Sequence, residues 1–271
     1  MVVMAVDVAI PRKILQTWKT HEVPEVWKSS PASIQKFMPG WEHVFMTNDD
    51  NRAFVEQHFP DFLPYYDGFK YPIMRADAIR YMWLYVSGGL YVDLDIEIMK
   101  PLDDLFTHGE LFVVPSGNTA WVLTNSFMAS VPGHPVWLDV IDEMKKPPSP
   151  LWITKHMQII GQTGPAMLDR VVKRSKHPYT VLPRLELMRC TQCDPTPCFF
   201  EGTYIRHLEG MSWCSWDSRL FNLLWCNRQF FAMLLIVLVV VLLAYFGHKF
   251  WRYGKFSCRW SRLRKKHFPS F

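Results

Sequence analysis

One segment near the C-terminus limits what this chain can become. FFAMLLIVLVVVLLAYF, residues 230–246, runs for 17 residues without a charged side chain. A helix of this length extends roughly 25 Å, near the short end of what crosses a bilayer. The alternative is a buried helix of a soluble protein, but a helix that is apolar on every side suits a membrane better. We therefore predict a transmembrane helix at 230–246, preceded by a juxtamembrane linker at 219–229 and followed by a tail at 247–271.

The tail carries the excess positive charge of the chain. Eight basic and no acidic residues follow Phe246, and without them 22 basic side chains stand against 25 acidic ones. The formal net charge of +5 therefore gives no sign of a body that binds nucleic acid. The positive-inside rule places the tail in the cytoplasm and the preceding body in the lumen. The short apolar run suits a thin membrane, such as that of the endoplasmic reticulum or Golgi.

The N-terminus does not explain how a lumenal body would be exported. MVVMAVDVAI has no basic region and contains Asp7, which makes it a poor signal peptide. Two explanations stay open: the orientation is the reverse, or a hydrophobic segment precedes this chain.

Four cysteines cluster ahead of the apolar run with the spacing C-x2-C-x4-C-x15-C. Two disulfides are favoured if the body is lumenal, because oxidising compartments preserve them. Zinc is less suited, since common zinc motifs use two tight pairs and here the fourth cysteine stands apart. Free thiols are the remaining alternative. The four are Cys190, Cys193, Cys198 and Cys214.

Strand and helix patterns alternate over residues 1–218. IPRKILQTW (10–18) predicts a strand, and residues 31–59 predict a helix, a strand and a second helix that Asp49 or Asp50 would cap. PIMRADAIRYMWLYVSGG predicts a helix that begins at Pro72 and ends at Gly88-Gly89. ELFVVPSG and TNSFMASVPG predict further strands, and HPVWLDVIDEMKK a further helix. This order predicts one α/β domain with a mainly parallel sheet, which binds ligands at the carboxyl ends of its strands.

The stretch GGLYVDLDIEI, residues 88–98, alternates apolar and acidic side chains. Read as one strand, it places Asp93, Asp95 and Glu97 on the same face. Two such carboxylates repel each other unless a cation lies near them, and oxygen ligands suit Mg²⁺ or Mn²⁺. A D-x-D pair alone is more often a solvated strand face, so the helix and the Gly-Gly turn before it carry the stronger signal. For Glu97 we expect solvent exposure.

Several blocks together resemble a known family. ILQTWKT, MRADAIRYMWLYVSGGLYVDLDIEIMKPLDDL, NSFMASVPGHP, TGPAML and HLEGMSW occur in this order between Ile10 and Trp213. They resemble glycosyltransferase family 32, the D-x-D sugar transferases, and most of all its mannosyl-inositol-phosphorylceramide synthase branch. The resemblance implies a GT-A type fold, a nucleotide-sugar donor that is GDP-mannose, a divalent metal (Mn²⁺ or Mg²⁺), and retention of the anomeric configuration.

The resemblance also implies roles for residues at matching positions. Asp93 and Asp95 would hold the metal and the donor diphosphate, with His207 near the metal. Asp77 and Arg80, which share a helix face, would contact the donor sugar. The remaining donor contacts would be Trp18 on the base and Ser212 and Trp213 at the phosphates.

Two positions depart from the family pattern. Asn125 matches a catalytic position facing the sugar, but Ser126 stands where a carboxylate is common. Leu15 replaces a family histidine. Both differences leave a catalytically dead membrane scaffold open as an alternative.

The resulting prediction is a membrane-anchored, metal-dependent retaining mannosyltransferase. Its partners would be GDP-mannose and an inositol-phosphorylceramide-type lipid acceptor, without nucleic acid, and a regulatory membrane subunit is a further candidate. The runner-up is a mannosyl- or galactosyltransferase acting on a glycan. A metal-dependent phosphate-ester hydrolase is less favoured, because the chain has no matching H-x-D or multi-histidine set.

Overall fold

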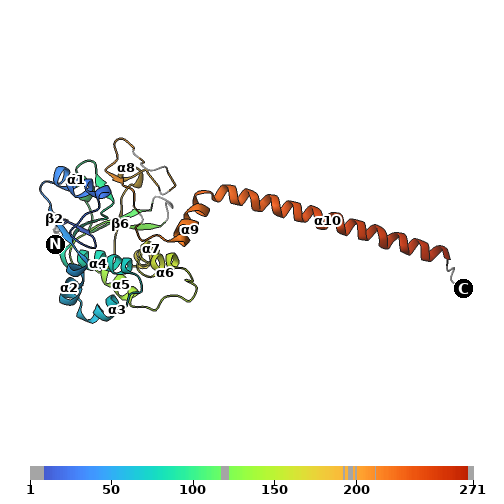
Figure 1. The fold of residues 1–271 in the computed structure, drawn as a ribbon, viewed down its shortest axis with the longest axis horizontal. Helices are drawn as coiled ribbons and strands as arrows, with labels where there is room; N and C mark the ends of the chain where they lie inside the picture. Colours follow the sequence, from blue (N-terminus) through green and yellow to red (C-terminus); the bar gives the residue numbers. More distant parts are fainter. Residues whose placement is uncertain are drawn as a thin grey trace, which may run out of the picture. The chain divides into compact units, whose positions relative to one another are not determined.

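The computed structural model describes residues 9–267, with gaps at 117–121, 192, 195–197, 199 and 211, and describes side chains as far as Trp251. The chain divides into two compact units, Met1–Arg219 and Leu220–Phe271. The first unit contains the sheets and helices α1 to α8 (Figure 1).

A six-stranded sheet forms the centre of the first unit, in the order β2-β1-β3-β6-β5-β7. β1 pairs in parallel with β2 and β3, and β5 with β7, whereas β6 runs antiparallel to β3 and β5. The predicted α/β class with a mainly parallel sheet is therefore confirmed, with β6 as the reversed strand. The strands are β1 (Lys13–Thr17), β2 (Glu42–Met46), β3 (Gly89–Val92), β5 (Leu111–Pro115), β6 (Leu123–Ser130) and β7 (Thr180–Val181).

Helices cover both faces of this sheet (Figure 1). α2, α4, α5 and α7 contribute to the core on one face, and α1 and α8 to the core on the other. Three 3₁₀ turns connect the elements. The helices are α1 (Ser29–Phe37), α2 (Asn48–His58), α3 (Leu63–Gly68), α4 (Pro72–Ser87), α5 (Val136–Met144), α6 (Lys155–Gln162), α7 (Pro165–Arg174) and α8 (Arg184–Leu187).

The central strands contribute side chains to both cores, because successive side chains of a strand point to opposite faces of the sheet. Leu15 and Tyr91 belong to the core under α4, while their neighbours Ile14, Leu90 and Val92 belong to the core under α1. Leu15, which replaces the family histidine, is fully buried and packs in the core. Apolar runs in β1 and β3 are thus explained by burial on two sides.

Local residues set the start of α2 and the end of α4. α2 is capped by Thr47, whose hydroxyl accepts from the Asp50 amide while the Asp50 carboxylate accepts from the Thr47 amide. The expectation of an aspartate cap was therefore wrong, since Asp50 is the partner in a capping box. α4 ends where expected, at Gly88 and Gly89, whose φ angles of 62° and 100° favour glycine.

The acidic stretch is not one strand, which corrects the sequence interpretation. β3 ends at Val92, and β4 (Ile96–Ile98) belongs to a separate two-stranded sheet with β8 (Ile205–His207). Between them the chain turns, with the Ile96 amide donating to the Asp93 carbonyl at 3.0 Å. The aspartates therefore lie at the carboxyl end of β3, at the point where the chain passes between two sheets.

Glu97 has a partner that the sequence did not reveal. It faces Arg206 across the β4–β8 pair, and the Arg206 Nε donates to its carboxylate at 2.9 Å. Its side chain is only 16% exposed, so the expectation of solvent exposure was wrong. The ion pair explains the third acid of the stretch as a cross-strand contact.

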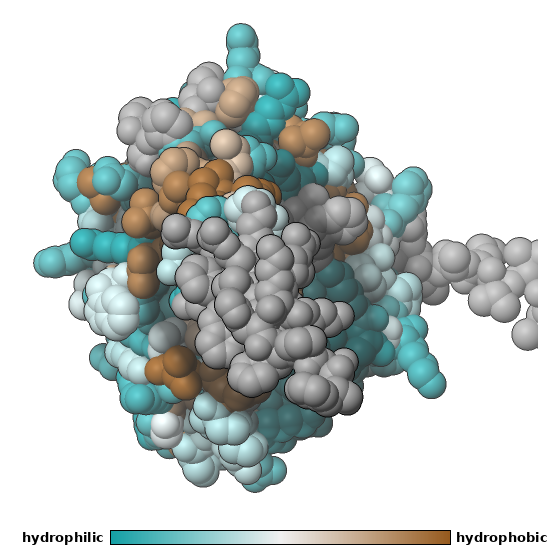
Figure 2. All heavy atoms as spheres, turned by 90° about the vertical axis from the view of Figure 1, so that its right-hand side faces the viewer, coloured by the Kyte–Doolittle hydropathy of each residue, from teal (hydrophilic) through white to brown (hydrophobic). Residues whose placement is uncertain are grey.

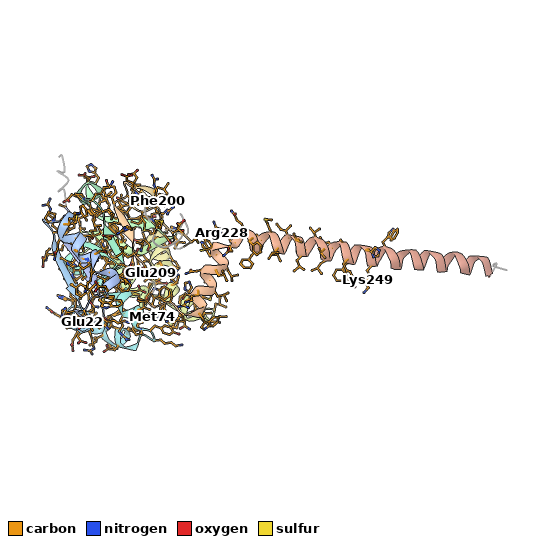
Figure 3. All side chains as sticks on the ribbon, turned by 45° about the horizontal axis from the view of Figure 1, so that its top comes forward. Glu22, Met74, Phe200, Glu209, Arg228 and Lys249 are labelled. Atoms are coloured by element: carbon orange, nitrogen blue, oxygen red, sulfur yellow. A yellow bond between two sulfur atoms is a disulfide. The ribbon has the colours of Figure 1, made fainter. Side chains whose placement is uncertain are left out.

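The second unit holds most of α9 (Trp216–Cys226) and all of α10 (Arg228–His267). The segment Arg228–Trp251 is long and apolar enough to cross a membrane and is not buried. Figure 3 shows its side chains projecting outward between Arg228 and Lys249. This stretch contains the predicted span at 230–246 and exceeds it at both ends.

Three of the four clustered cysteines, Cys190, Cys193 and Cys198, are in disulfides, and two of them are joined directly. Cys190 and Cys198 form a disulfide, and Cys214 is a free thiol. Within the described residues no group of three or more His, Cys, Asp or Glu side chains is arranged as a metal site. The zinc alternative thus gains no support from this segment.

Candidate active site

Asp93 lies directly after β3 and is held by neighbours from four elements, β1, β3, β6 and α4. Its carboxylate accepts from the Tyr91 hydroxyl at 2.5 Å and lies 3.0 Å from an Arg80 nitrogen. Its own amide donates to the Ser126 carbonyl of β6, and Gln16 of β1 contacts its carbonyl oxygen at 3.4 Å. The side chain keeps 23% exposure, so Asp93 is fixed in orientation yet open to a ligand.

Arg80 is the cation at the centre of this cluster. From α4 it reaches Asp93, lies 3.5 Å from Asp77, and donates to the Asn125 carbonyl at 3.0 Å. Its guanidinium also stacks over the Tyr91 ring, 4.9 Å from the centroid. Burial alone would lower the pKa of Arg80, but the Asp93 carboxylate and its other anionic neighbours raise the pKa above the ordinary value. Arg80 is therefore a permanent charge that orders both carboxylates.

Asp77 is buried one helical turn before Arg80 and accepts three polar contacts. Asn125 donates to one oxygen at 2.9 Å and the Thr163 hydroxyl donates to the other at 2.9 Å. Burial raises the pKa of Asp77 to about 6, although Arg80 and these hydrogen bonds oppose the rise. With this raised pKa, Asp77 can accept a hydrogen bond from a sugar hydroxyl as a carboxylate or donate one to it as a carboxylic acid.

Asn125 and Ser126 of β6 take different parts. The Asn125 amide bridges Asp77 and the Tyr81 hydroxyl, the latter at 3.0 Å, so its orientation is set by both. Ser126 is paired through its hydroxyl with Thr124 at 2.9 Å. Asn125 thus belongs to the acidic cluster, whereas the Ser126 hydroxyl is hydrogen-bonded to Thr124.

Asp95 has a buried carboxylate oxygen to which a ligand could bind. Its Oδ1 is buried without a hydrogen-bond partner, and its backbone carbonyl accepts from Leu208 at 2.7 Å. Burial, and after it the charge of Asp93, raises the pKa of Asp95 to about 7. A divalent cation beside this oxygen would offset both the burial of the Asp95 charge and its repulsion by Asp93. Asp93 and Asp95 therefore fit such an ion, with donor phosphates and water completing its shell.

Gly210 provides the space that the Asp95 carboxylate occupies. A Cβ at this position would lie 2.0 Å from Asp95 Oδ2 and 3.0 Å from its Cγ. Any larger residue would therefore displace the carboxylate. The segment after β8 and the turn after β3, separated by more than a hundred residues, define one side of the site together.

His207 ends β8 and lies opposite Ile96 in the two-stranded sheet. Burial lowers its pKa, and the nearby Asp93 carboxylate acts in the opposite direction. A neutral imidazole near the acidic pair is the form that binds metals. The structure brings His207 near Asp93 but, within the described residues, does not gather it with both aspartates into a three-ligand group.

The residues expected at the donor base and phosphates have contacts with groups other than the acidic pair. Trp18 packs edge-on against Trp27 with centroids 4.8 Å apart, and Trp27 donates to the Glu209 carbonyl at 2.6 Å. Trp213 stacks on His156 at 5.7 Å and its carbonyl accepts from Lys155. Ser212 is exposed. Trp18 is thus linked through Trp27 to the loop after β8, while Trp213 rests on α6.

Four functional neighbours were missed by the sequence interpretation. Tyr81 and Tyr91 are buried core aromatics whose hydroxyls also contact Asn125 and Asp93. The other two, Thr163 and Gly210, lie inside the quoted blocks TGPAML and HLEGMSW, so those blocks already contained the signal.

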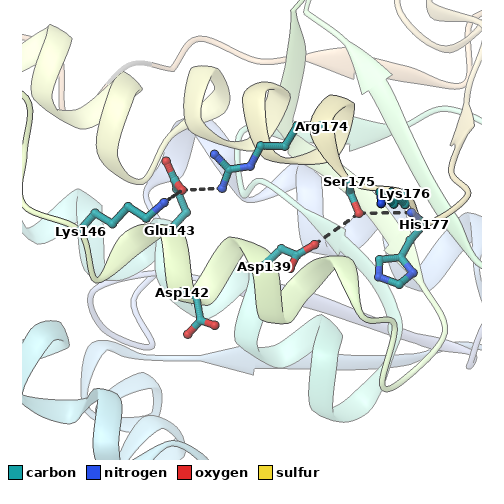
Figure 4. Close-up of a pocket in the computed structure, with 8 residues that line it drawn as sticks. All are labelled: Asp139, Asp142, Glu143, Lys146, Arg174, Ser175, Lys176 and His177. Atoms are coloured by element: carbon teal, nitrogen blue, oxygen red, sulfur yellow. Dashed lines mark hydrogen bonds and ion pairs between the residues drawn. The ribbon is translucent and has the colours of Figure 1, made fainter.

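A surface pocket lies elsewhere, along α5 and the end of α7 (Figure 4). Glu143 is one of its lining residues and pairs with Lys146 and Arg174. These three side chains of the pocket therefore compensate one another's charge. In the part of the chain that the structure describes, the buried side-chain atoms without a hydrogen-bond partner belong to Asn51, Asp95 and His134. We place the candidate active site at the carboxyl end of β3 because the unpartnered oxygen of Asp95 is there.

Gly210→Ala is expected to weaken metal affinity and transfer by roughly 10–100-fold, the usual range for a change beside a metal ligand. The reason is the 2.0 Å approach of the new Cβ to Asp95 Oδ2. Manganese titration followed by electron paramagnetic resonance, together with transfer rates, measures both effects. Gly68→Ala is the matched control, since nothing lies within 4 Å of its Cβ position. Equal effects of the two substitutions would contradict the proposed packing of Asp95.

Comparison with known proteins yields a family and several relatives. Residues 24–112 match the model described as a glycosyltransferase sugar-binding region containing DXD motif. Inositol phosphoceramide mannosyltransferase 2 of Schizosaccharomyces pombe is 32% identical over 227 residues, covering 81% of this chain and 62% of that protein. Mannosyl phosphorylinositol ceramide synthase SUR1 of Saccharomyces cerevisiae is 31% identical over 220 residues, covering 79% and 54%. The chain thus spans somewhat more than half the length of these relatives.

Proposed function

We propose, because this chain belongs to the glycosyltransferases whose sugar-binding region contains a DXD motif, that it transfers mannose from GDP-mannose to an inositol-phosphorylceramide-type lipid. The names of its relatives support mannose and this lipid class. The observation that carries the proposal is the pair Asp93 and Asp95: the Asp95 oxygen is buried without a partner, and the Asp93 carboxylate is fixed by Arg80.

In this proposal the acidic pair holds the donor through a divalent cation, manganese or magnesium. When bound, the ion neutralises charge that develops on the departing diphosphate. Arg80 fixes the Asp93 carboxylate, so the pair needs no reorganisation when the donor arrives. Gly210 keeps the Asp95 carboxylate in place, and His207 is available as a further ligand.

Donor sugar recognition is assigned to Asp77, Arg80 and Asn125. Thr163 and Asn125 each donate to Asp77, which holds its two oxygens in fixed directions. Such a preorganised carboxylate can accept from a sugar hydroxyl and select the sugar by the geometry of its hydroxyls. We assign the base to Trp18 and the phosphates to Ser212 and Trp213. Retention of the anomeric configuration follows from the family resemblance.

Membrane anchoring explains the apolar helix. We assign the span to residues 230–246, the basic tail to the cytoplasm, and the catalytic body of residues 1–218 to the lumen of the Golgi or endoplasmic reticulum. An anchor raises the effective concentration of the active site at the surface where a lipid acceptor lies. Protection of the body from protease in sealed vesicles measures this orientation, and digestion of the body there would reverse it.

Donor choice is tested by offering several nucleotide sugars, with manganese, to the purified full chain. We expect GDP-mannose to be turned over in preference to UDP-sugars, and inositol-phosphorylceramide to accept the sugar. Turnover of a UDP-sugar in place of GDP-mannose would overturn the mannose assignment. Transfer to a soluble mannoside, with none to the lipid, would instead favour an acceptor glycan.

A further inference from the structure

The helix that precedes the membrane segment has an exposed apolar face. In α9, Trp216, Leu220, Leu223 and Leu224 recur at the spacing of a single helix face and are 45–74% exposed. Asp217 and Ser218, on another face of the same helix, are buried. Within the described residues no core cluster contains the four apolar side chains.

A second apolar feature is built into the loop between α5 and α6. Leu151 and Ile153 are 77% and 82% exposed. Trp152 between them points the other way, because its ring lies against Gly161 of α6, where a Cβ would approach it to 2.6 Å. Its carbonyl also accepts from Gln158 at 3.0 Å. The anchored tryptophan therefore holds the two aliphatic side chains outward.

Hydrogen bonds connect this loop to the beginning of α9. The His156 amide donates to the Asp217 carboxylate at 2.7 Å, and the His156 ring lies 3.1 Å from the Ser218 hydroxyl. The Asp217 carboxylate also accepts hydrogen bonds from Ser215 and the Ser218 amide, which lower its pKa to about 2 against the effect of burial. Ile153 is three residues before His156, and Trp216 directly precedes Asp217. Because His156 and Asp217 are hydrogen-bonded, Ile153 and Trp216 belong to one region of the first unit.

Chain connectivity identifies what covers these residues. α9 ends at Cys226 and the candidate membrane segment begins at Arg228, with one residue between them. Such a connection spans at most about 7–10 Å, so the end of α9 cannot leave the membrane surface. Tryptophan and arginine, here Trp216, Arg219 and Arg228, are residues typical of the interface between bilayer and water. Figure 2 shows hydrophobic patches among hydrophilic residues on one face of the molecule.

We propose that α9 lies in the surface of the lipid bilayer as an amphipathic helix, and that Leu151 and Ile153 of the first unit insert into the same bilayer. The partner is the bilayer itself, and the contact adds to the anchor provided by α10. It restricts the catalytic body to a fixed distance from the lipids instead of leaving it free on a tether.

The test uses the full chain reconstituted in phosphatidylcholine vesicles. A solvent-sensitive fluorescent amino acid replaces Ile153 or Leu223, and brominated phosphatidylcholine serves as the quencher. We expect blue-shifted emission and quenching at both positions at least threefold greater than at Val26 and Leu185, control positions that are 60% and 58% exposed. Emission at 153 and 223 equal to that of the controls would overturn the proposal. Shielding that depends on protein density and not on bromine would also overturn it, in favour of a second copy.

A second measurement rests on the proposed function and separates the two ideas. The double variant Ile153→Gln, Leu223→Gln is expected to lower transfer to lipid in vesicles by about fivefold to tenfold, while metal-dependent donor hydrolysis stays unchanged. Loss of both activities equally would count against docking. If the chain transfers no mannose at all, bromolipid quenching still decides the docking proposal by itself.

Discussion

Asp95→Asn is expected to abolish sugar transfer while leaving a more stable protein. The carboxylate is buried beside Asp93 with one oxygen unpartnered, an arrangement that costs stability unless a cation is bound. Removing the charge should lower kcat by roughly a thousandfold, because a bound metal supplies several kcal/mol of charge stabilisation. Transfer rates and manganese binding measure the loss, and the thermal midpoint of the full chain in detergent measures the gain. Retained activity would contradict the metal site.

The pH dependence of this variant gives an independent check. The folded pKa of Asp95, about 7, lies above its ordinary value of 3.8, so the folded state binds the extra proton between these values. The contribution to stability is complete below pH 3.8 and is lost as the pH rises through about 7. Without metal, the advantage of Asp95→Asn over the parent should therefore grow from pH 5 to pH 8. An advantage that is equal at both pH values would show that burial of Asp95 imposes no charge penalty.

Arg80→Met is expected to reduce both folding stability and transfer. It removes the cation that faces buried Asp77 and Asp93, and breaking a buried ion pair on one side costs about 3–5 kcal/mol. For a body of this size that corresponds to roughly 6–20 °C in the thermal midpoint. Differential scanning fluorimetry of the full chain measures the shift.

Two comparison variants make the Arg80 experiment specific. Arg52→Met breaks an exposed pair with Asp67, whose nitrogen and oxygen are 2.8 Å apart, and should shift the thermal midpoint much less than Arg80→Met, because water screens the exposed pair. Adding Asp93→Asn to Arg80→Met should recover part of the lost stability, because one of the two uncompensated charges is removed. A double variant less stable than Arg80→Met alone would argue against a charge pair as the cause.

Local sequence signals were sufficient for the scaffold. Pro72 and the Gly88-Gly89 pair bracket α4 as expected, because proline suits a first helical turn and glycine the turn that ends it. Since Asp77 and Arg80 are three residues apart on this helix, their shared face also followed from spacing. The contact of Arg80 with Asp93, at the end of β3, then required only that α4 pack back on the sheet.

The turn at Asp93 to Asp95 could not be predicted in the same way. Residues 88–98 alternate as one strand would, yet β4 leaves the large sheet to pair with β8 more than a hundred residues later. That pairing depends on Ile205 and Arg206, whose partners no local pattern identifies. Thr163 and Gly210 are likewise small residues whose importance arises only from what lies against them.

The β4–β8 pairing has a consequence for the order in which the protein acquires activity. Contacts between distant parts of a chain close late in folding, since the entropy of the intervening loop opposes them. The last strand of the six-stranded sheet ends at Val181. The surroundings of Asp95 also include Gly210, which is only 18 residues before the membrane segment begins at Arg228. A chain interrupted after β7 would thus contain a sheet and an acidic turn but no finished site. Amide hydrogen exchange should accordingly be faster in β8 than in β3. Catalytic activity should appear only when the part of the body that is nearest in sequence to the membrane segment has folded.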